Sequence, residues 1–75
     1  DSHSGLAGIA HWINGFFALT GEHQVKKADP LVAAIKQQVD ALYAQGRNTV
    51  MGDEELEWLV KATDRAKYRL WVTGE

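Results

Sequence analysis

The sequence has no cysteine and no long hydrophobic run. Without cysteine there is no disulfide framework, thiolate nucleophile or cysteine-ligated zinc site. No apolar stretch approaches the about 20 residues of a membrane span, so we expect a soluble, cytoplasmic protein with no membrane partner. The first residues, Asp1 to Ser4, contain neither an initiator methionine nor a basic signal region, which predicts a piece cut from a longer protein.

Positive charge is also scarce, since eight Lys and Arg stand against ten Asp and Glu, for a net charge of −2. A protein that binds nucleic acid must neutralise many phosphates, so this balance argues against a nucleic-acid partner. The 75 residues suffice for one small domain whose core is marginal. A compact helical domain fits this length, whereas a large catalytic cavity does not.

Apolar residues recur at helical spacing near the N-terminus and predict a first helix over residues 4–19. Ser4 can serve as its N-cap and Gly21 as its stop. Gly8 and Gly15 lie seven residues apart, on nearly the same face, where they would permit another backbone to approach closely. The apolar stripe consists of Leu6, Ile9, Ala10, Ile13, Phe16 and Phe17.

A polar linker over residues 21–28 leads to a second helix, which we place at residues 30–45. Asp29 followed by Pro30 is typical of an N-cap with proline in the first helical position. Gly46 stands in the C′ position that commonly ends a helix. The second helix is therefore defined at both ends by local signals.

A third helix is predicted over residues 53–69. Gly52 and Glu55 occupy the N-cap and N3 positions of a weakened capping box, and the acids that follow Gly52 suit the positive end of the helix dipole. Glu57 and Lys61 are spaced for an i,i+4 ion pair.

The connector before this third helix, residues 47–51, is short, so the second and third helices should form an antiparallel hairpin over residues 29–69. The predicted fold class is all-α, a single three-helix domain over residues 1–75. Its hairpin core should consist of Ile35, Val39, Leu42, Leu56, Leu59 and Val60.

Candidate ligand sites are few. His3 and His11 would lie about 12 Å apart along a helix, too far to chelate one ion, so no metal site is expected. Lys26 and Lys27 could hold a phosphate, or simply form a solvated linker, and Asp29 at the helix cap would repel an anion. No cofactor-binding residue is assigned.

Aromatic residues are numerous for so small a chain, and three short helices cannot bury all of them. We therefore expect an exposed apolar patch that serves as an interface. The residues concerned are Trp12, Phe16, Phe17, Trp58, Tyr68 and Trp71.

Three blocks in order resemble the segment after the catalytic barrel in the isopropylmalate synthase and homocitrate synthase family, most closely its re-face citrate synthase and homocitrate synthase-like branch. The resemblance covers roughly residues 3–65. The blocks are the run from His3 to Asn14; Asp29-Pro30-Leu31-Val32, opening a helix that ends Tyr43-Ala44-Gln45-Gly46-Arg47; and Gly52-Asp53-Glu54-Glu55-Leu56.

This resemblance implies a transferase that condenses the acetyl group of acetyl-CoA with a 2-oxo acid, on a TIM barrel carrying a divalent metal. The metal ligands and the general base would belong to the barrel. The chain would then be an accessory region that contributes to dimerisation and caps an active site. Its partners would be the missing barrel and a second copy of the protein, and alone it would have no synthase activity.

The resemblance also suggests two catalytic candidates, His11 and His3. In homocitrate synthases a histidine directly follows the Ala-Gly-Ile triplet, but here that position is Ala10 and His11 comes one residue later, turned by about 100° on a helix. A packing position beside Trp12 is the alternative for His11. The family's tyrosine ahead of the Asp-Pro start is replaced by Val25.

Two other functions stay open. The chain could be a free-standing helical module whose apolar face binds a partner protein. It could also be a helix-turn-helix DNA binder, which the acidic balance and the acids at residues 53–55 oppose.

Overall fold

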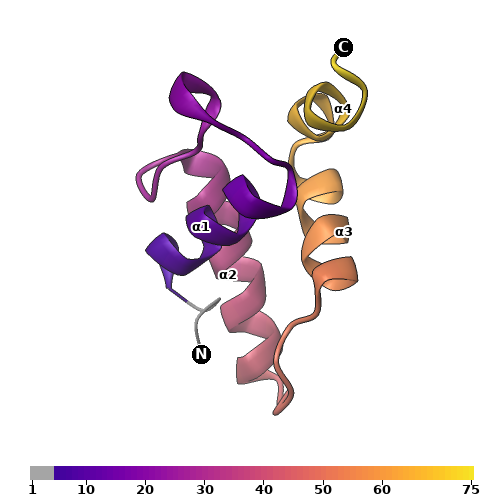
Figure 1. Cartoon of the computed structure of the whole chain (residues 1–75). Coiled ribbons are helices and arrows are strands. Elements are labelled where there is room, and N and C mark those ends of the chain that lie inside the picture. The colour runs from indigo at the N-terminus through magenta and orange to yellow at the C-terminus, as the bar shows by residue number, and fades with distance from the viewer. Residues whose placement is uncertain (1–4) are drawn as a thin grey trace.

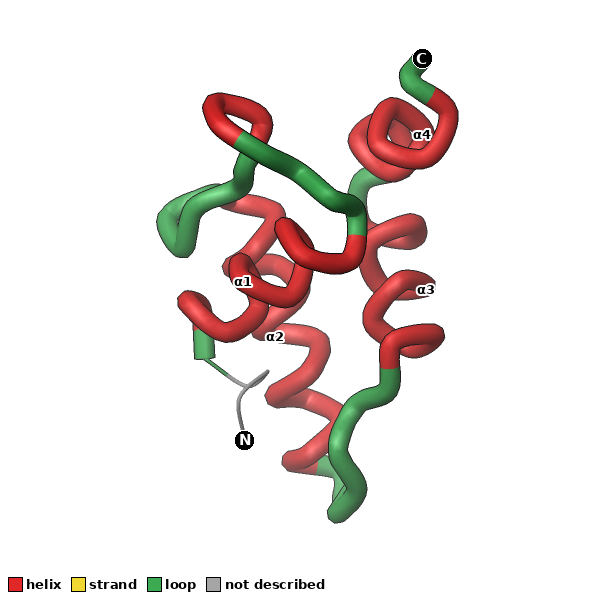
Figure 2. Tube along the Cα trace, viewed as in Figure 1, coloured by secondary structure: helices red, strands yellow, loops and turns green. Residues whose placement is uncertain are grey.

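The computed structural model describes residues 5–75, and within that range every regular element is a helix (Figures 1 and 2). The all-α class is confirmed, but the predicted number of three helices is wrong. None of the described helices is long and apolar enough to cross a membrane. In chain order the elements are α1 (Leu6–Phe16), the 3-10 turn η1 (Gly21–His23), α2 (Pro30–Ala44), α3 (Asp53–Thr63) and α4 (Arg65–Thr73).

Helix α2 begins and ends where local signals predict. The Leu31 backbone N–H donates to Asp29 Oδ1 at 2.9 Å, and Pro30 takes the first position, where its missing N–H costs no hydrogen bond. At the other end Gly46 adopts a φ of +106°, a left-handed conformation that glycine reaches without steric cost. The predicted Asp-Pro start and glycine stop are both confirmed.

The predicted third helix over residues 53–69 is two helices, α3 and α4, divided at Asp64. The Asp64 backbone leaves the helical conformation (φ −144°, ψ 87°), and its side chain accepts a hydrogen bond from the Lys67 N–H at 3.0 Å. Asp64 therefore ends α3 and caps the start of α4. Helical spacing continues on both sides of the break, so periodicity alone predicts one helix.

This break also changes the partners of Glu57 and Lys61, which the sequence predicts as an ion pair within one helix. The Tyr68 hydroxyl of α4 donates to Glu57 at 2.8 Å, and Lys61 Nζ lies 5.6 Å from the Tyr68 ring centroid. The predicted ion pair between Glu57 and Lys61 is therefore replaced, among the described residues, by two contacts to one tyrosine.

Helix α1 is shorter than the predicted span of residues 4–19. Its N-cap is Gly5, which offers no side-chain hydrogen bond, and Ser4 lies outside the described residues. The helix ends before Gly21, since Ala18 already adopts a φ of +55°. A Cβ added to Gly15 would meet no atom within 4 Å, so the described part of the chain does not make the close backbone approach predicted there.

The core lies along α2, with α1 packed against it and α3 packed beside it, while α4 contacts α3. In Figure 1, α2 runs downward and α3 returns upward next to it. Of the predicted hairpin core, Leu42 is only half-buried and the rest is buried. The buried core residues are Ile9, Ala10, Trp12, Ile13, Val25, Leu31, Val32, Ile35, Val39, Met51, Leu56, Leu59 and Val60.

The aromatic residues are covered more fully than the sequence predicts. Trp12, expected on an open face, is only 8% exposed, and its Nε1–H donates to Asp53 Oδ1 at 2.8 Å. Phe17 packs against Tyr68 and Trp71 of α4, with ring centroids 6.0 and 5.1 Å away. Helix α4 therefore covers part of the face that three helices would leave open.

Candidate functional site

His11 lies on the exposed side of α1, at a shallow hollow of about 330 Å³. Because the side chain is exposed, it does not fill the packing position beside Trp12 that the sequence offered as an alternative. The hollow is otherwise lined by the end of α1 and the segment after it, through Asn14, Gly15, Ala18, Leu19, Thr20 and Gln24.

Nothing in residues 5–75 forms a hydrogen bond or ion pair with the His11 side chain. A histidine that acts as a general acid or base needs a proton partner within hydrogen-bond reach, and a second group often orients its ring. For His11, both groups would have to come from outside residues 5–75. His3, the second candidate, lies outside the described residues.

The wall of the hollow is held in place by Asn14. Its Nδ2 donates to the Val25 carbonyl oxygen at 2.9 Å, and the Val25 N–H donates to Asn14 Oδ1 at 2.8 Å. One side-chain amide thus satisfies both backbone polar groups of a buried residue. This clamp folds the segment after α1 back over the helix, so the predicted polar linker over residues 21–28 is an ordered part of the domain.

The same segment contains a strained turn at Ala18. A φ of +55° costs a residue with a Cβ about 1–2 kcal/mol. The turn is closed by backbone hydrogen bonds from Ala18 N to the Gly15 oxygen at 3.3 Å and from Leu19 N to the Asn14 oxygen at 2.9 Å. Strain of this kind persists only where surrounding contacts fix the backbone, and here it lies in the wall beside His11.

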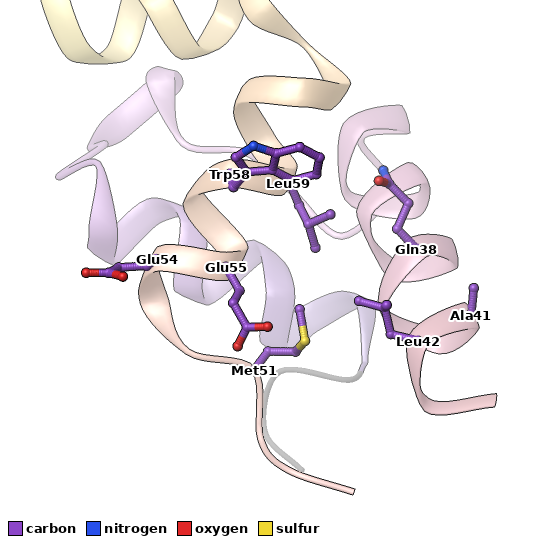
Figure 3. A pocket seen from close by; sticks show the side chains of 8 residues that line it. All are labelled: Gln38, Ala41, Leu42, Met51, Glu54, Glu55, Trp58 and Leu59. Atoms are coloured by element: carbon purple, nitrogen blue, oxygen red, sulfur yellow. The ribbon is translucent and has the colours of Figure 1, made fainter. Parts of the chain in front are cut away.

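A second hollow, of about 510 Å³, separates α2 from α3 and is mainly apolar (Figure 3). We call it the α2/α3 groove. Trp58, 64% exposed, lies at its edge, and Leu59 and Leu42 approach each other from the two helices. The sequence predicts Trp58 among the aromatic residues of an exposed patch but does not predict a groove beside it. The groove is lined by Gln38, Ala41, Leu42, Met51, Glu54, Glu55, Trp58 and Leu59.

Arg47 holds Glu55, one of the residues that line this groove. Its guanidinium donates to both carboxylate oxygens of Glu55, at 2.5 and 2.6 Å, and also to the Thr49 and Val50 carbonyl oxygens at 3.0 and 3.2 Å. The hydrogen bonds from Arg47, and next the one from the Gly52 N–H, lower the pKa of Glu55, and those with Glu55 raise the pKa of Arg47. The Gly52 bond to Glu55 is the weakened capping box predicted from the sequence.

Neither hollow offers a metal site. The described residues contain no group of three or more His, Asp or Glu side chains that could hold an ion. Lys26 and Lys27 are exposed, and the nearby Asp29 contacts Lys67 Nζ at 3.5 Å while capping α2. The Asp29 carboxylate at the start of α2 would therefore repel a phosphate bound there.

These features define a small all-α domain that presents an exposed histidine at one hollow and an apolar groove between α2 and α3. That description alone does not define a reaction, because similar helical folds serve many functions. No protein-family model and no solved structure matches the chain.

Two curated proteins do match it. The chain is 47% identical over 60 residues to the Citrate (Re)-synthase of Clostridium kluyveri and 43% identical over 58 residues to the Citrate (Re)-synthase of Syntrophus aciditrophicus. The matches cover 80% and 77% of this chain but 13% and 9% of those proteins, so the chain spans about a tenth of their length. This similarity supports a citrate, homocitrate or isopropylmalate synthase-like family, as the sequence blocks predict.

Proposed function

We propose that the chain is a C-terminal accessory region of an acyl-CoA-dependent 2-oxo acid synthase. The enzyme would form a 2-hydroxy dicarboxylic or tricarboxylic acid by a Claisen-type condensation of acetyl-CoA with a 2-oxo acid. The observation that carries this proposal is the 47% identity over 60 residues to a Citrate (Re)-synthase about eight times as long as the match.

In this proposal the chain contributes to dimerisation and covers an active site that it does not itself contain. The described residues offer no donor set for the divalent metal, which would reside in the barrel of the parent enzyme. The His11 side of α1 would face a neighbouring catalytic centre, because His11 is exposed and lacks a partner among the described residues. The Asn14 clamp would keep the wall of that hollow in place while the partner surface binds.

A segment exchange tests this role. The matching 60 residues of the Clostridium kluyveri Citrate (Re)-synthase would be replaced by those of this chain, and citrate formation would be measured. We expect the exchanged enzyme to assemble and to form citrate, the enzyme without the segment to be inactive, and the 75-residue chain alone to be inactive. An exchanged enzyme that assembles normally but forms no citrate would contradict the proposal.

The two candidate histidines are tested in the exchanged enzyme. His11→Ala and His3→Ala should lower kcat more than they change KM or thermal stability, because a proton carrier acts in the reaction step. His23→Ala, which removes an exposed imidazole from η1, is the matched control and should leave kcat unchanged. Unchanged kcat in both candidate variants would reduce the role of the chain to assembly and covering the site.

A further inference from the structure

One exposed face of α3 carries an acid, a tryptophan and a base in that order along the helix axis. Glu54, Trp58 and Lys61 are all exposed, and at 100° per residue they fall within an arc of about 60°. The helical rise places Glu54 about 6 Å before Trp58 and Lys61 about 4.5 Å after it. Trp58 thus lies near the midpoint between two opposite charges.

These three side chains have few contacts within the described chain. Glu54 forms no hydrogen bond or ion pair with any described residue, and the described contact of Lys61 is with the Tyr68 ring. Trp58 is 64% exposed and borders the mainly apolar α2/α3 groove (Figure 3). An exposed tryptophan over an apolar groove, with charges at the rim, is typical of a protein interface.

We propose that this face of α3 pairs with the same face of a second copy, antiparallel, about a two-fold axis near Trp58. Reversing the helix direction about that point brings Glu54 of one copy opposite Lys61 of the other, and the converse pair forms on the other flank. The tryptophans of the two copies meet between the charge pairs, against the two grooves. A parallel pairing would instead oppose Glu54 with Glu54, which is repulsive.

The charge order therefore selects both the partner and the direction of pairing. Such a contact is isologous and closes as a dimer rather than extending into a filament. This contact would be the surface through which the chain contributes to dimerisation, and its role in the enzyme rests on the proposed function. Association is measured on the 75-residue chain without any synthase assay, so a failure of one proposal is distinguishable from a failure of the other.

One helix face and its groove form a small interface, so we expect a dimer dissociation constant weaker than about 1 μM. Analytical ultracentrifugation of the chain from micromolar to millimolar concentration should show a reversible monomer–dimer equilibrium. Trp58→Ala should weaken it by at least about tenfold, because a central exposed tryptophan carries a large share of interface energy. A strictly monomeric chain throughout this range would overturn the proposal.

Charge-reversal variants test whether Glu54 of one copy pairs with Lys61 of the other. Glu54→Lys alone and Lys61→Glu alone should each weaken dimerisation at least about tenfold, since each creates like-charge pairs on both flanks. A mixture of the two variants should associate again, as a mixed dimer. The Glu54→Lys copy carries lysine at positions 54 and 61, and the Lys61→Glu copy carries glutamate at both. Each flank of the mixed dimer therefore pairs a lysine with a glutamate. A mixture that associates no better than either variant would overturn the antiparallel arrangement.

Two controls and one alternative outcome complete this test. Glu22→Lys reverses an exposed charge in η1, far from this face in sequence, and should not change the dimer. Circular dichroism melting of each variant must show that it is folded at the temperature of measurement. If Phe16→Asp abolished association while Trp58→Ala left it intact, the interface would be the end of α1 and the proposal would be wrong.

Discussion

The two long connections of this domain are held by different forces. Residues 17–29, between α1 and α2, are fastened by the neutral amide of Asn14 on the backbone of buried Val25. Residues 45–52, between α2 and α3, are fastened mainly by the exposed ion pair of Arg47 with Glu55, with Tyr43 donating to the Thr49 carbonyl oxygen at 2.7 Å.

This difference shows how a small domain can order its loops by unlike means. The first connection satisfies backbone groups that are buried, and losing such bonds is costly because water cannot replace them. The second uses charged groups that water solvates well, so its bonds contribute less and respond to pH and salt. We therefore expect the two connections to respond differently to substitution and to solution conditions.

The largest effect should come from truncating a core side chain on which both connections depend only indirectly, through the fold as a whole. Leu59 of α3 is only 6% exposed and faces α2. Leu59→Ala should lower the free energy of unfolding by about 2–4 kcal/mol, as truncations of buried leucine do. Denaturant titration measures this loss, and a change below about half a kilocalorie per mole would show that Leu59 is not core.

The next effect should isolate the connection between α1 and α2. Asn14→Ala would leave the Val25 N–H and carbonyl without their described partner, at a cost of about 1–3 kcal/mol. Thr20→Ala is the matched control, because it removes a polar side chain from the same hollow without a described side-chain hydrogen bond. Equal melting temperatures for the two variants would contradict the clamp.

A smaller effect of opposite sign is expected within the same connection. Ala18→Gly relieves left-handed strain but adds backbone freedom to the unfolded chain, so it should stabilise the protein by about 0.5–1 kcal/mol. Ala33→Gly, in the regular part of α2, should instead destabilise by about 1 kcal/mol. The same sign for both substitutions in denaturant titrations would refute the strain at Ala18.

The smallest effect should appear at the connection between α2 and α3, and only on acidification. Because Arg47 lowers the folded-state pKa of Glu55, the pair contributes its full stability above the unfolded pKa of about 4.3 and loses it as the pH falls through the lower folded value. Glu55→Gln should therefore have a flatter dependence of melting temperature on pH below about 4.3 than the unaltered chain. Parallel curves for the two proteins would show that this ion pair does not stabilise the fold.

The sequence predicts the parts of this fold that depend on neighbouring residues. The ends of α2 follow from Asp29, Pro30 and Gly46, because caps act over a few positions. Asp64 is a local signal for the start of α4, because aspartate often caps helices. The apolar spacing continues across Asp64 and therefore predicts one helix where there are two.

The remaining features depend on residues distant in sequence. The buried Trp12 indole donates its hydrogen bond to Asp53, 41 residues away, and the clamp pairs Asn14 with Val25, which no local pattern indicates. The α2/α3 groove depends on how far apart two helices pack, which side-chain spacing within each helix does not determine. The exposure of His11 likewise depends on which side of α1 the other helices cover.

The hydrogen bond between Trp12 and Asp53 also has a consequence for the order of folding. The Trp12–Asp53 hydrogen bond closes a segment of 41 residues, which costs more entropy than joining α2 and α3 through residues 45–52, so α2 and α3 should associate before this bond forms. The Trp12 indole enters its buried site only when the start of α3 is in place to accept its hydrogen bond. In a chain with Trp58 and Trp71 replaced by phenylalanine, the fluorescence of Trp12 would therefore mark the final docking step, after circular dichroism has reported the helices.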